Sequence, residues 1–271
     1  MPTIDVNDTT LHYERTGDGP AVLFVHGIFG DADAWTDQAA RLSDRYTCVR
    51  YDRRGHTGSA RGDATLTDAL HADDAAGLIE ALDLGACLLV GSSSGAAIGL
   101  EVALRHGALL RGVVLSEPPL FSLDADARSA VMGEVTPRIE EAMAAGGPPA
   151  AVDAFLSTLC PGLWSIIDDE RKDSYRANAG IGFEDLQSPS LDVSAADLAD
   201  VSIPALVLAG RESHAAFRSV ARRLAAALAD ARFVELEGSG HVTYAERPDD
   251  FANAVRVFAA EVDRRATGPS T

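Results

Sequence analysis

The chain has 271 residues, of which 46% are hydrophobic and 24% charged, a composition typical of one large globular domain or of a domain with an insertion. No apolar run reaches the roughly 20 residues of a membrane-spanning helix, and the first residues lack the basic and apolar pattern of a secretory signal, so we expect a cytoplasmic protein. The formal net charge of -18 argues against nucleic acid and anionic membrane surfaces as partners, because phosphate groups would be repelled.

The first part of the chain alternates predicted strands with predicted helices. The unbroken apolar run at 21–25 is typical of a strand buried on both faces, as in a parallel sheet. Around it, strands are expected at 4–6, 11–15, 46–51, 86–90 and 112–116, and helices at 33–42, 66–82 and 94–106. Strands joined by single helices predict right-handed crossovers, and therefore a mostly parallel central sheet flanked by helices.

This alternation stops at Glu117-Pro118-Pro119, after which the sequence is helix-like without strong strands. It resumes with strands expected at 203–209 and 232–236, and helices at 215–229 and 248–264. We therefore predict an α/β core formed by residues 1–118 and 199–271, with residues 119–198 inserted as a helical cap, or lid.

The strongest chemical signal is the segment Gly91-Ser92-Ser93-Ser94-Gly95, which fits Gly-x-Ser-x-Gly between an expected strand and an expected helix. A nucleophilic hydroxyl must stand clear of the sheet on a sharp turn, and that turn leaves room only for small residues two positions away. The following helix also presents its N-terminus to the site, which favours developing negative charge. Ser93, centred between the glycines, is therefore the predicted nucleophile in preference to Ser92 and Ser94.

A second loop, His26-Gly27-Ile28-Phe29-Gly30, follows the buried strand at 21–25. Such a loop can aim a backbone N–H at an oxyanion, together with the N–H of the residue after the nucleophile. We assign these two oxyanion donors to Ile28 and Ser94, and we expect a structural role for His26.

A serine hydroxyl is a poor nucleophile near neutral pH and needs a general base. Among the seven histidines, His241 is the best placed, because it lies in a glycine-containing loop between the last expected strand and the last expected helix. His214 is the runner-up, and the others, apart from His26, are expected at surface or turn positions.

These motifs, taken in order, resemble the α/β-hydrolase superfamily from about Ala21 to Phe258, apart from the cap. The segment 51–59, Tyr-Asp-Arg-Arg-Gly-His-Thr-Gly-Ser, resembles the family's Asp-x-Arg-Gly-x-Gly-x-Ser, and Gly240-His241 followed by Glu246-Arg247-Pro248 resembles its histidine loop and last helix. The resemblance implies the α/β-hydrolase fold, and the order of nucleophile first and histidine last agrees with it.

The carboxylate that would orient the histidine departs from the family pattern. The family places it as an Asp three residues after a glycine, here Gly210, but that position holds Ser213, which carries no negative charge. Glu212 is one residue away and stays an alternative. We prefer Glu117, because sites form at the strand ends of open α/β sheets and because Glu117 resembles the acid of the zearalenone-type lactonases.

The resemblance implies a serine hydrolase that cleaves a carboxylic ester or lactone of a small, hydrophobic molecule through an acyl-enzyme, with no metal or organic cofactor. The expected partner is a small-molecule substrate, and the residues expected to bind it, or else to pack the cap on the core, are Phe29, Phe121, Met132, Phe155, Leu163, Trp164 and Phe183.

Two alternatives remain open at this point: a non-hydrolytic enzyme of the same fold, such as a cyclase, and a ligand receptor with slow turnover. The oligomeric state is also open, a homodimer included. The cysteines Cys48, Cys87 and Cys160 have no metal-ligand spacing, and we expect reduced thiols without a catalytic role.

Overall fold

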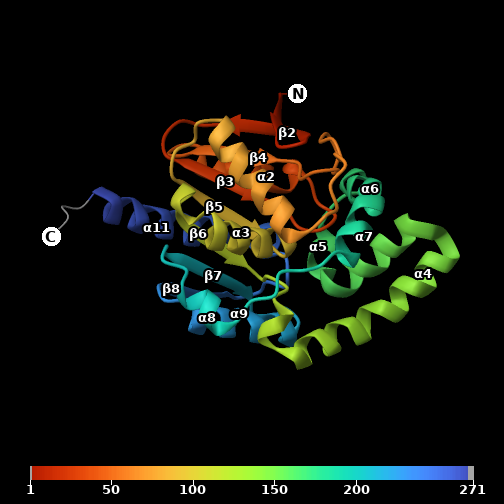
Figure 1. Cartoon of the computed structure of the whole chain (residues 1–271). Helices are drawn as coiled ribbons and strands as arrows, with labels where there is room; N and C mark the ends of the chain where they lie inside the picture. Colours follow the sequence, from red (N-terminus) through yellow and green to blue (C-terminus); the bar gives the residue numbers. More distant parts are fainter. Residues whose placement is uncertain (1, 268–271) are drawn as a thin grey trace.

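The computed structural model describes residues 2–267; Met1 and residues 268–271 of the expected core segment lie outside the described part. Its centre is an eight-stranded sheet with the strand order β1-β2-β4-β3-β5-β6-β7-β8 (Figure 1). Strand β2 pairs antiparallel with β1 and β4, and all other pairs are parallel. The strands are β1 (Thr3–Val6), β2 (Thr9–Thr16), β3 (Ala21–Val25), β4 (Thr47–Tyr51), β5 (Cys87–Ser92), β6 (Leu110–Ser116), β7 (Ala205–Gly210) and β8 (Ala231–Leu236).

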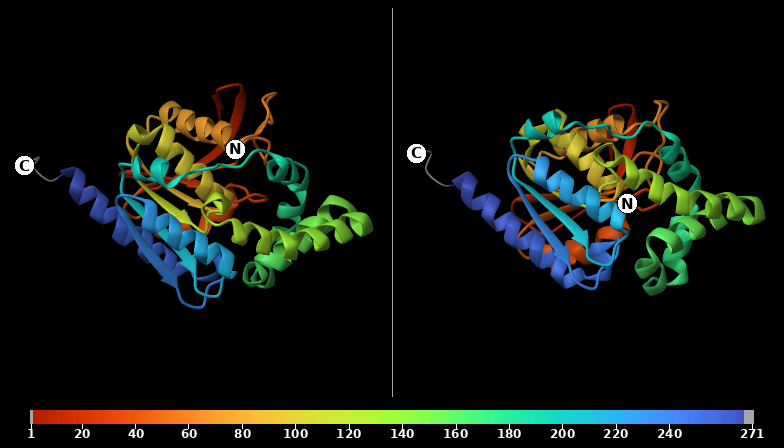
Figure 2. Two further views of the ribbon diagram at one scale, coloured as in Figure 1. Left: turned by 60° about the horizontal axis from the view of Figure 1, so that its bottom comes forward. Right: turned by 90° about the horizontal axis from the view of Figure 1, so that it is seen from below.

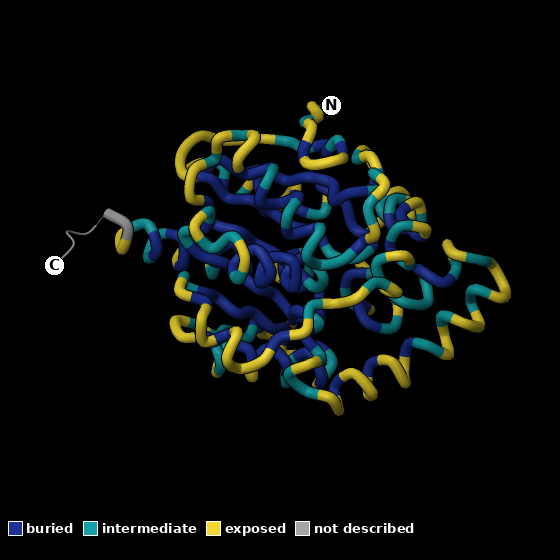
Figure 3. Tube along the Cα trace, viewed as in Figure 1, coloured by how far each residue is buried: buried dark blue, intermediate teal, exposed yellow. Residues whose placement is uncertain are grey.

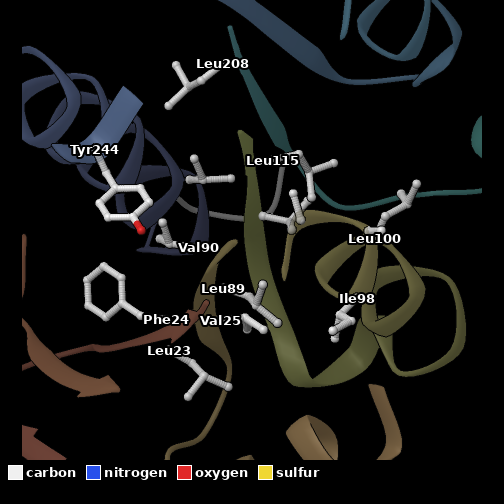
Figure 4. Close-up of a cluster of buried hydrophobic side chains, with 14 of the residues drawn as sticks. Leu23, Phe24, Val25, Leu89, Val90, Ile98, Leu100, Leu115, Leu208 and Tyr244 are labelled. Carbon is white, nitrogen blue, oxygen red and sulfur yellow. The ribbon is translucent and has the colours of Figure 1, made fainter. Parts of the chain in front are cut away.

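The core forms on both faces of this sheet. Every residue of β3, β4, β5 and β7 is buried (Figure 3). The unbroken apolar sequence of β3 is typical of a strand in a parallel sheet that is covered on both faces. Side chains from neighbouring elements meet there, for example Val25 of β3, Leu89 of β5 and Ile98 of the following helix (Figure 4). Because these strands are packed on both faces, their ends are held in fixed positions, and the loops of the site follow those ends.

Helices pack on the sheet in two groups. One group contains α2 (Asp68–Ala81) and α3 (Ser94–Arg105), which contact each other, and the other contains α1 (Thr36–Leu42) and α11 (Pro248–Thr267). Figure 1 shows α3 in front of the sheet and α11 behind it. Helix α9 (Ala215–Ala227) packs on β7 and β8. The expected α/β sandwich is therefore confirmed.

The segment between β6 and β7 is helical. It contains the short 3₁₀ turn η3 (Phe121–Leu123) and the helices α4 (Ala125–Leu159), α5 (Pro161–Ile166), α6 (Asp169–Ala177), α7 (Ala179–Gln187) and α8 (Ala195–Ala199). The cap was expected to end at residue 198, and α8, the last helix before β7, ends at Ala199. The division into a core and a cap stays a prediction.

Helix α4 is two arms joined at a kink. Gly147 has φ 71° and ψ -162°, outside the helical region, and Pro148 and Pro149 follow it. Glycine permits the positive φ, and the prolines start the second arm because their rings suit the first turn of a helix. In Figures 1 and 2 the arms project from the sheet on the side opposite the C-terminus.

Some local features differ from the sequence expectations. The helix expected at 33–42 begins as the 3₁₀ turn η1 (Ala32–Trp35) before α1, and the short helix α10 (Thr243–Glu246) was not expected. The three cysteines are free and buried, and burial raises the pKa of Cys48 and of Cys87 to about 12. Within residues 2–267, no helix has both the length and the apolar character needed to cross a membrane.

Candidate active site

Ser93 lies on the sharp turn between β5 and α3. Its backbone adopts φ 54° and ψ -126°, a conformation that costs free energy for a residue with a side chain. A hydrogen bond of 2.8 Å from the Ser93 amide to the Ser116 carbonyl ties the turn to the end of β6. The strain and the tie together hold the serine between a strand and the first turn of a helix, the geometry expected of a nucleophile.

The glycines on either side of Ser93 are required by the packing of the turn. A Cβ at Gly91 would lie 2.2 Å from the Gly95 carbonyl oxygen, and a Cβ at Gly95 would lie 2.2 Å from the Val25 carbonyl oxygen. Both obstacles are backbone atoms, which cannot rotate away as a side chain could. The two glycines therefore allow β5, α3 and β3 to approach one another around Ser93.

Glu117 and His241 meet in the interior of the protein. His241 Nδ1 lies 2.8 Å from Glu117 Oε2, and the glutamate is fully buried. The other carboxylate oxygen, Oε1, accepts a hydrogen bond of 2.8 Å from the Gly210 amide. Glu117 directly follows β6 and has φ 52°, so the backbone leaves the sheet abruptly at this residue. The two side chains thus have the arrangement of an acid that orients a histidine.

Ser213, in the position where the family places its acid, donates a hydrogen bond from Oγ to Glu117 Oε2. The family's acid position is therefore occupied by a serine that donates to a carboxylate from another strand end. Glu212, the alternative acid, is exposed, and its amide bonds to the Ser239 carbonyl. Of the two glutamates, only Glu117 contacts His241 among the described residues.

The loop that carries His241 is held by a residue whose role the sequence did not reveal. The Glu246 carboxylate accepts hydrogen bonds from the amides of Gly240, at 2.8 Å, and Val242, at 3.2 Å. These amides flank His241 on both sides. The pattern Gly240-His241 followed by Glu246 was visible in the sequence, but the hydrogen bonds depend on the turn into α10.

The loop after β3 lies against the nucleophile turn, since a Cβ on Gly27 would be 3.5 Å from Ser93 Cβ. Its carbonyls are taken by several donors. Gly30 N and His26 Nδ1 contact the Gly27 carbonyl at 3.0 and 2.8 Å, and His56 Nε2 contacts the Ile28 carbonyl at 2.9 Å. Because a trans peptide points its C=O and N–H in opposite directions, these bonds fix the direction of the Ile28 amide.

The helical segment also holds this loop. Asn178 Nδ2 donates to the carbonyls of Phe29, at 3.2 Å, and Gly30, at 2.9 Å. Asp185 of α7 pairs with Arg53, whose guanidinium lies 3.0 Å away. Burial alone would raise the pKa of Asp185, but the Arg53 charge and His71 hold it well below its ordinary value. The carboxylate therefore stays ionised and links the helical segment to Arg53, which in turn donates to the Gly27 and Ile28 carbonyls of the loop at 3.4 Å.

His26 has the structural position that the sequence suggested. It is fully buried, its Nδ1 lies 2.8 Å from the Gly27 carbonyl, and its Nε2 accepts a hydrogen bond from the Arg53 amide at 2.9 Å. Burial and the nearby Arg53 charge lower the pKa of His26 well below its ordinary value. A neutral imidazole with one donor and one acceptor fits both bonds.

A cavity of about 110 Å³ opens beside these groups. It is lined by Ser93, His241, Ile28 and Ser94, and its wall is otherwise mainly apolar. Of the residues expected to bind substrate, those in the wall are Phe29, Phe121, Met132, Phe155 and Leu163. The volume exceeds the space of a single water several-fold, so it can hold a small organic molecule.

Trp164 and Phe183, also expected to bind substrate, are not part of this wall. Lys172 and Arg176 lie over the Trp164 ring, and the Phe183 ring packs edge-on against Phe29 with centroids 5.1 Å apart. Trp164 is therefore covered by cations, and Phe183 supports Phe29 from behind.

The cavity wall includes residues that the sequence did not single out, among them Tyr175, Tyr244 and Leu186. Tyr175 and Tyr244 come from the helical segment and from α10, and their hydroxyls are hydrogen-bonded to each other. Burial raises the pKa of both phenols, so both stay protonated. No sequence motif marks these positions, because the wall depends on how the helical segment packs on the core.

No cluster of three or more metal-ligating side chains occurs among residues 2–267.

Comparisons with known proteins find hydrolases and structures of similar fold. A 2-(acetamidomethylene)succinate hydrolase from Mesorhizobium japonicum is 28% identical over 266 residues, which cover 94% of this chain and 93% of the relative. Among solved structures, an esterase from Thermogutta terrifontis superposes with a TM-score of 0.78 at 23% identity and covers 97% and 99% of the two chains. An enol-lactonase from Burkholderia xenovorans LB400 superposes with a TM-score of 0.65 at 26% identity, covering 96% of this chain and 100% of the other.

The profile of one family matches nearly the whole described chain, through both the sheet and the helical segment. It is the family described as Alpha/beta hydrolase, and the match spans residues 22–254. This range contains the serine turn, the loop after β3, Glu117 and His241. The chain therefore belongs to the alpha/beta hydrolase family.

Proposed function

We propose that this protein is a serine hydrolase that cleaves a carboxylic ester or lactone of a small, hydrophobic molecule through an acyl-enzyme. The observation that carries the proposal is the 2.8 Å contact between Glu117 Oε2 and His241 Nδ1, with His241 and Ser93 in the wall of one cavity. A histidine held by a buried carboxylate beside a strained serine is the arrangement that activates a hydroxyl.

In this proposal, Ser93 Oγ attacks the acyl carbonyl while His241 Nε2 takes the hydroxyl proton. Glu117 keeps the proton of the neutral imidazole on Nδ1 and stabilises the cation that forms. The amides of Ile28 and Ser94 bind the oxyanion of the tetrahedral intermediate. When the intermediate collapses, the bond between the acyl carbon and the alkoxide oxygen breaks, and His241 gives its proton to that oxygen. The products are an alcohol and an acyl group that stays bound to Ser93 Oγ as an ester. Water cleaves that ester by the same steps, with His241 as base.

The residues around the cavity favour a hydrophobic substrate. Phe121, Phe155 and Leu163 offer apolar contacts, and these side chains come mainly from the helical segment. We therefore propose that residues 119–198 act as the cap that shapes the substrate pocket, and that Phe29 forms its floor from the core side. Apolar walls with a few polar groups are usual for small-molecule sites.

The names of the relatives support hydrolysis and leave the bond type to experiment. The relative from Mesorhizobium japonicum is a 2-(acetamidomethylene)succinate hydrolase, and the structural neighbour from Burkholderia xenovorans is an enol-lactonase. Of the reactions named for these two proteins, we propose the one of the lactonase type, the cleavage of an ester or lactone. The apolar cavity suits an acyl group better than it suits a strongly charged substrate.

We also propose a cytoplasmic location.

The test combines turnover with labelling of the nucleophile. Purified protein would be assayed on short p-nitrophenyl esters and on simple lactones, with Ser93→Ala as the matched control. A fluorophosphonate should label the wild type once per chain and leave Ser93→Ala unlabelled. Labelling without turnover on any ester or lactone would favour the ligand-receptor alternative, and an unlabelled wild type would overturn the serine-hydrolase proposal.

A further inference from the structure

A second cavity, of about 250 Å³, adjoins the one at Ser93. We call it the side chamber, and its polar residues include Arg53, Asp68, His71, Arg128 and Asp185. The two cavities share part of their walls, and the shared residues are Ile28, Ser94, Pro119, Phe121, Met132 and Leu186. Because the shared wall contains both proposed oxyanion donors, a molecule whose acyl carbonyl is bound there can extend into the side chamber.

Two apolar side chains mark where the cavities reach the surface. Met132 of α4 and Leu186 of α7 are each 40% exposed, and both line both cavities. Large apolar side chains exposed at a cavity are typical of a binding site. The Ser93 cavity and the side chamber thus open next to each other between α4 and α7.

The carboxylates of the side chamber already have hydrogen-bond donors. Asp185 accepts from His71 Nε2 at 3.0 Å and lies 3.0 Å from the Arg53 guanidinium. Asp68 Oδ2 accepts a hydrogen bond of 2.7 Å from the Leu191 amide. One oxygen of each acid therefore has a donor within the protein, and the Arg53 charge is balanced by Asp185.

Donor capacity, in contrast, is left over. Arg128, on the first turn of α4, is exposed and forms no ion pair with any residue that the structure describes. Four buried polar atoms of chamber residues also have no hydrogen-bond partner within residues 2–267: Arg53 Nε, His71 Nδ1, Ser94 Oγ and Asp185 Oδ2, the last of which is ion-paired with the Arg53 guanidinium at 3.0 Å. Of these atoms, Arg53 Nε and Ser94 Oγ can donate, and buried donors normally have a partner, so together with Arg128 they indicate a site for an acceptor.

We propose that the side chamber binds a carboxylate at the far end of the substrate, with the Arg128 guanidinium as its direct ligand. This inference rests on the proposed function, because the carboxylate is placed relative to an acyl carbonyl at Ile28 and Ser94. A guanidinium suits the role, since its planar fork matches the two oxygens of a carboxylate. In a chain of net charge -18, an anionic group needs such a local cation to enter.

The substrate is therefore amphipathic. Its ester or lactone bond and apolar part lie over Ser93, and its carboxylate lies beside Arg128. The ion pair Arg53–Asp185 and the neighbouring His71 form the polar back of the chamber. The Arg53–Asp185 pair and the charges of Asp68 and Arg128 nearly balance, so the chamber is less negative than a chain of net charge -18 is as a whole.

The test uses two esters that differ only at the far end, p-nitrophenyl hydrogen glutarate and p-nitrophenyl pentanoate. In the wild type, kcat/KM should be higher for the hemi-ester. In Arg128→Gln, the ratio of the two kcat/KM values should fall about ten-fold, which is the effect of losing one charge-assisted hydrogen bond. Arg138→Gln is the matched control, because Arg138 lies on the same helix, contacts Thr158 and lines neither cavity. It should keep the wild-type ratio.

A binding measurement separates this inference from the proposed chemistry. Monomethyl glutarate and methyl pentanoate would be titrated by calorimetry into Ser93→Ala and into Ser93→Ala with Arg128→Gln. Tighter binding of monomethyl glutarate that disappears with Arg128→Gln supports the side chamber even if no ester is cleaved. An unchanged kcat/KM ratio in Arg128→Gln, or equal binding of the two ligands to both proteins, would overturn it while leaving ester hydrolysis intact.

Discussion

Ser213 Oγ donates a hydrogen bond to Glu117 Oε2, the same oxygen that lies 2.8 Å from His241 Nδ1. The residue in the family's acid position and the glutamate that we propose as the acid are thus partners. With the Gly210 amide on Oε1, the carboxylate accepts hydrogen bonds on both oxygens. Such bonds hold the carboxylate in one orientation, with Oε2 directed at the histidine.

Replacing the acid should remove most of the activity. Glu117→Gln keeps the shape of the side chain but loses the charge and favours the wrong histidine tautomer, so we expect kcat to fall by about 10³ to 10⁴. Glu212→Gln, at an exposed position, is the control and should stay near wild type. Steady-state kinetics on an ester substrate checks both variants. The reverse result, with Glu212→Gln inactive and Glu117→Gln active, would show that the acid is Glu212.

The supporting hydroxyl should matter less than the acid it contacts. Ser213→Ala removes one donor from Glu117 and leaves the Gly210 amide and His241 in place. The loss of one hydrogen bond to a charged group corresponds to about 1.5–3 kcal/mol, so kcat should fall about ten-fold or somewhat more, with KM little changed. A loss as large as that of Glu117→Gln would mean that Ser213 itself acts on the histidine.

Glu246 should act as a positioning residue for His241. In Glu246→Gln, one of the two bonds to the flanking amides of Gly240 and Val242 can no longer form. We expect kcat to fall about ten-fold while KM changes less, because the histidine is displaced and the pocket remains. Glu237→Gln is the control, since Glu237 is exposed and pairs with Arg211. Equal kinetics for the two variants would contradict the positioning role.

A methyl group at Gly95 should disrupt the nucleophile turn. The added Cβ of Gly95→Ala would lie 2.2 Å from the Val25 carbonyl oxygen and 2.6 Å from that of His26. Because both obstacles are backbone, we expect the free energy of unfolding to fall by about 2–4 kcal/mol and the activity to be lost. At Gly107, a Cβ would meet no atom within 4 Å, so Gly107→Ala should be nearly neutral. Urea unfolding of the two variants measures the difference.

Two buried histidines should make the fold sensitive to mild acid. Burial and the Arg53 charge lower the pKa of His56 to about 3, and the same causes lower the pKa of His26. Between the unfolded pKa of about 6.5 and these folded values, the unfolded chain binds protons that the native state does not. Stability is therefore complete above about pH 6.5 and falls as the pH decreases, by up to about 1.4 kcal/mol per pH unit for each histidine.

Urea unfolding between pH 7 and pH 5 tests this dependence. This range lies above the pH at which carboxylates take up most of their protons. The variant His56→Gln removes one of the two groups and should make the decline with falling pH less steep. If its stability falls with pH as steeply as that of the wild type, the decline has another origin.

The sequence was sufficient for the parts of the site that depend on local geometry. The strand at 21–25 was predicted with its observed bounds, because an unbroken apolar run has few alternatives in an α/β protein. The turn at Ser93 needs two glycines at fixed spacing, and such a requirement is visible in five residues. Glu117 could be selected because it directly follows a strand, and the end of that strand is local information too.

The parts that depend on distant contacts could not be predicted. Asn178 reaches the loop after β3 from the helical segment, Asp185 reaches Arg53 after β4, and nothing in their neighbourhood in the sequence marks either residue. Trp164 was expected near the substrate, but the cations Lys172 and Arg176 cover it. In each case the outcome depends on how the helices pack on the sheet, which the hydrophobic pattern alone leaves undetermined.

The left-handed backbone at Glu117 has a consequence for protein engineering. The proposed acid is also the first residue after β6, and Pro118 and Pro119 continue directly from it toward η3 and α4. A chimera that exchanges the helical segment between relatives should therefore be joined after Pro119. A junction placed before Glu117 would import the donor's backbone path at the acid, and the recipient would acquire a new pocket together with a misdirected carboxylate.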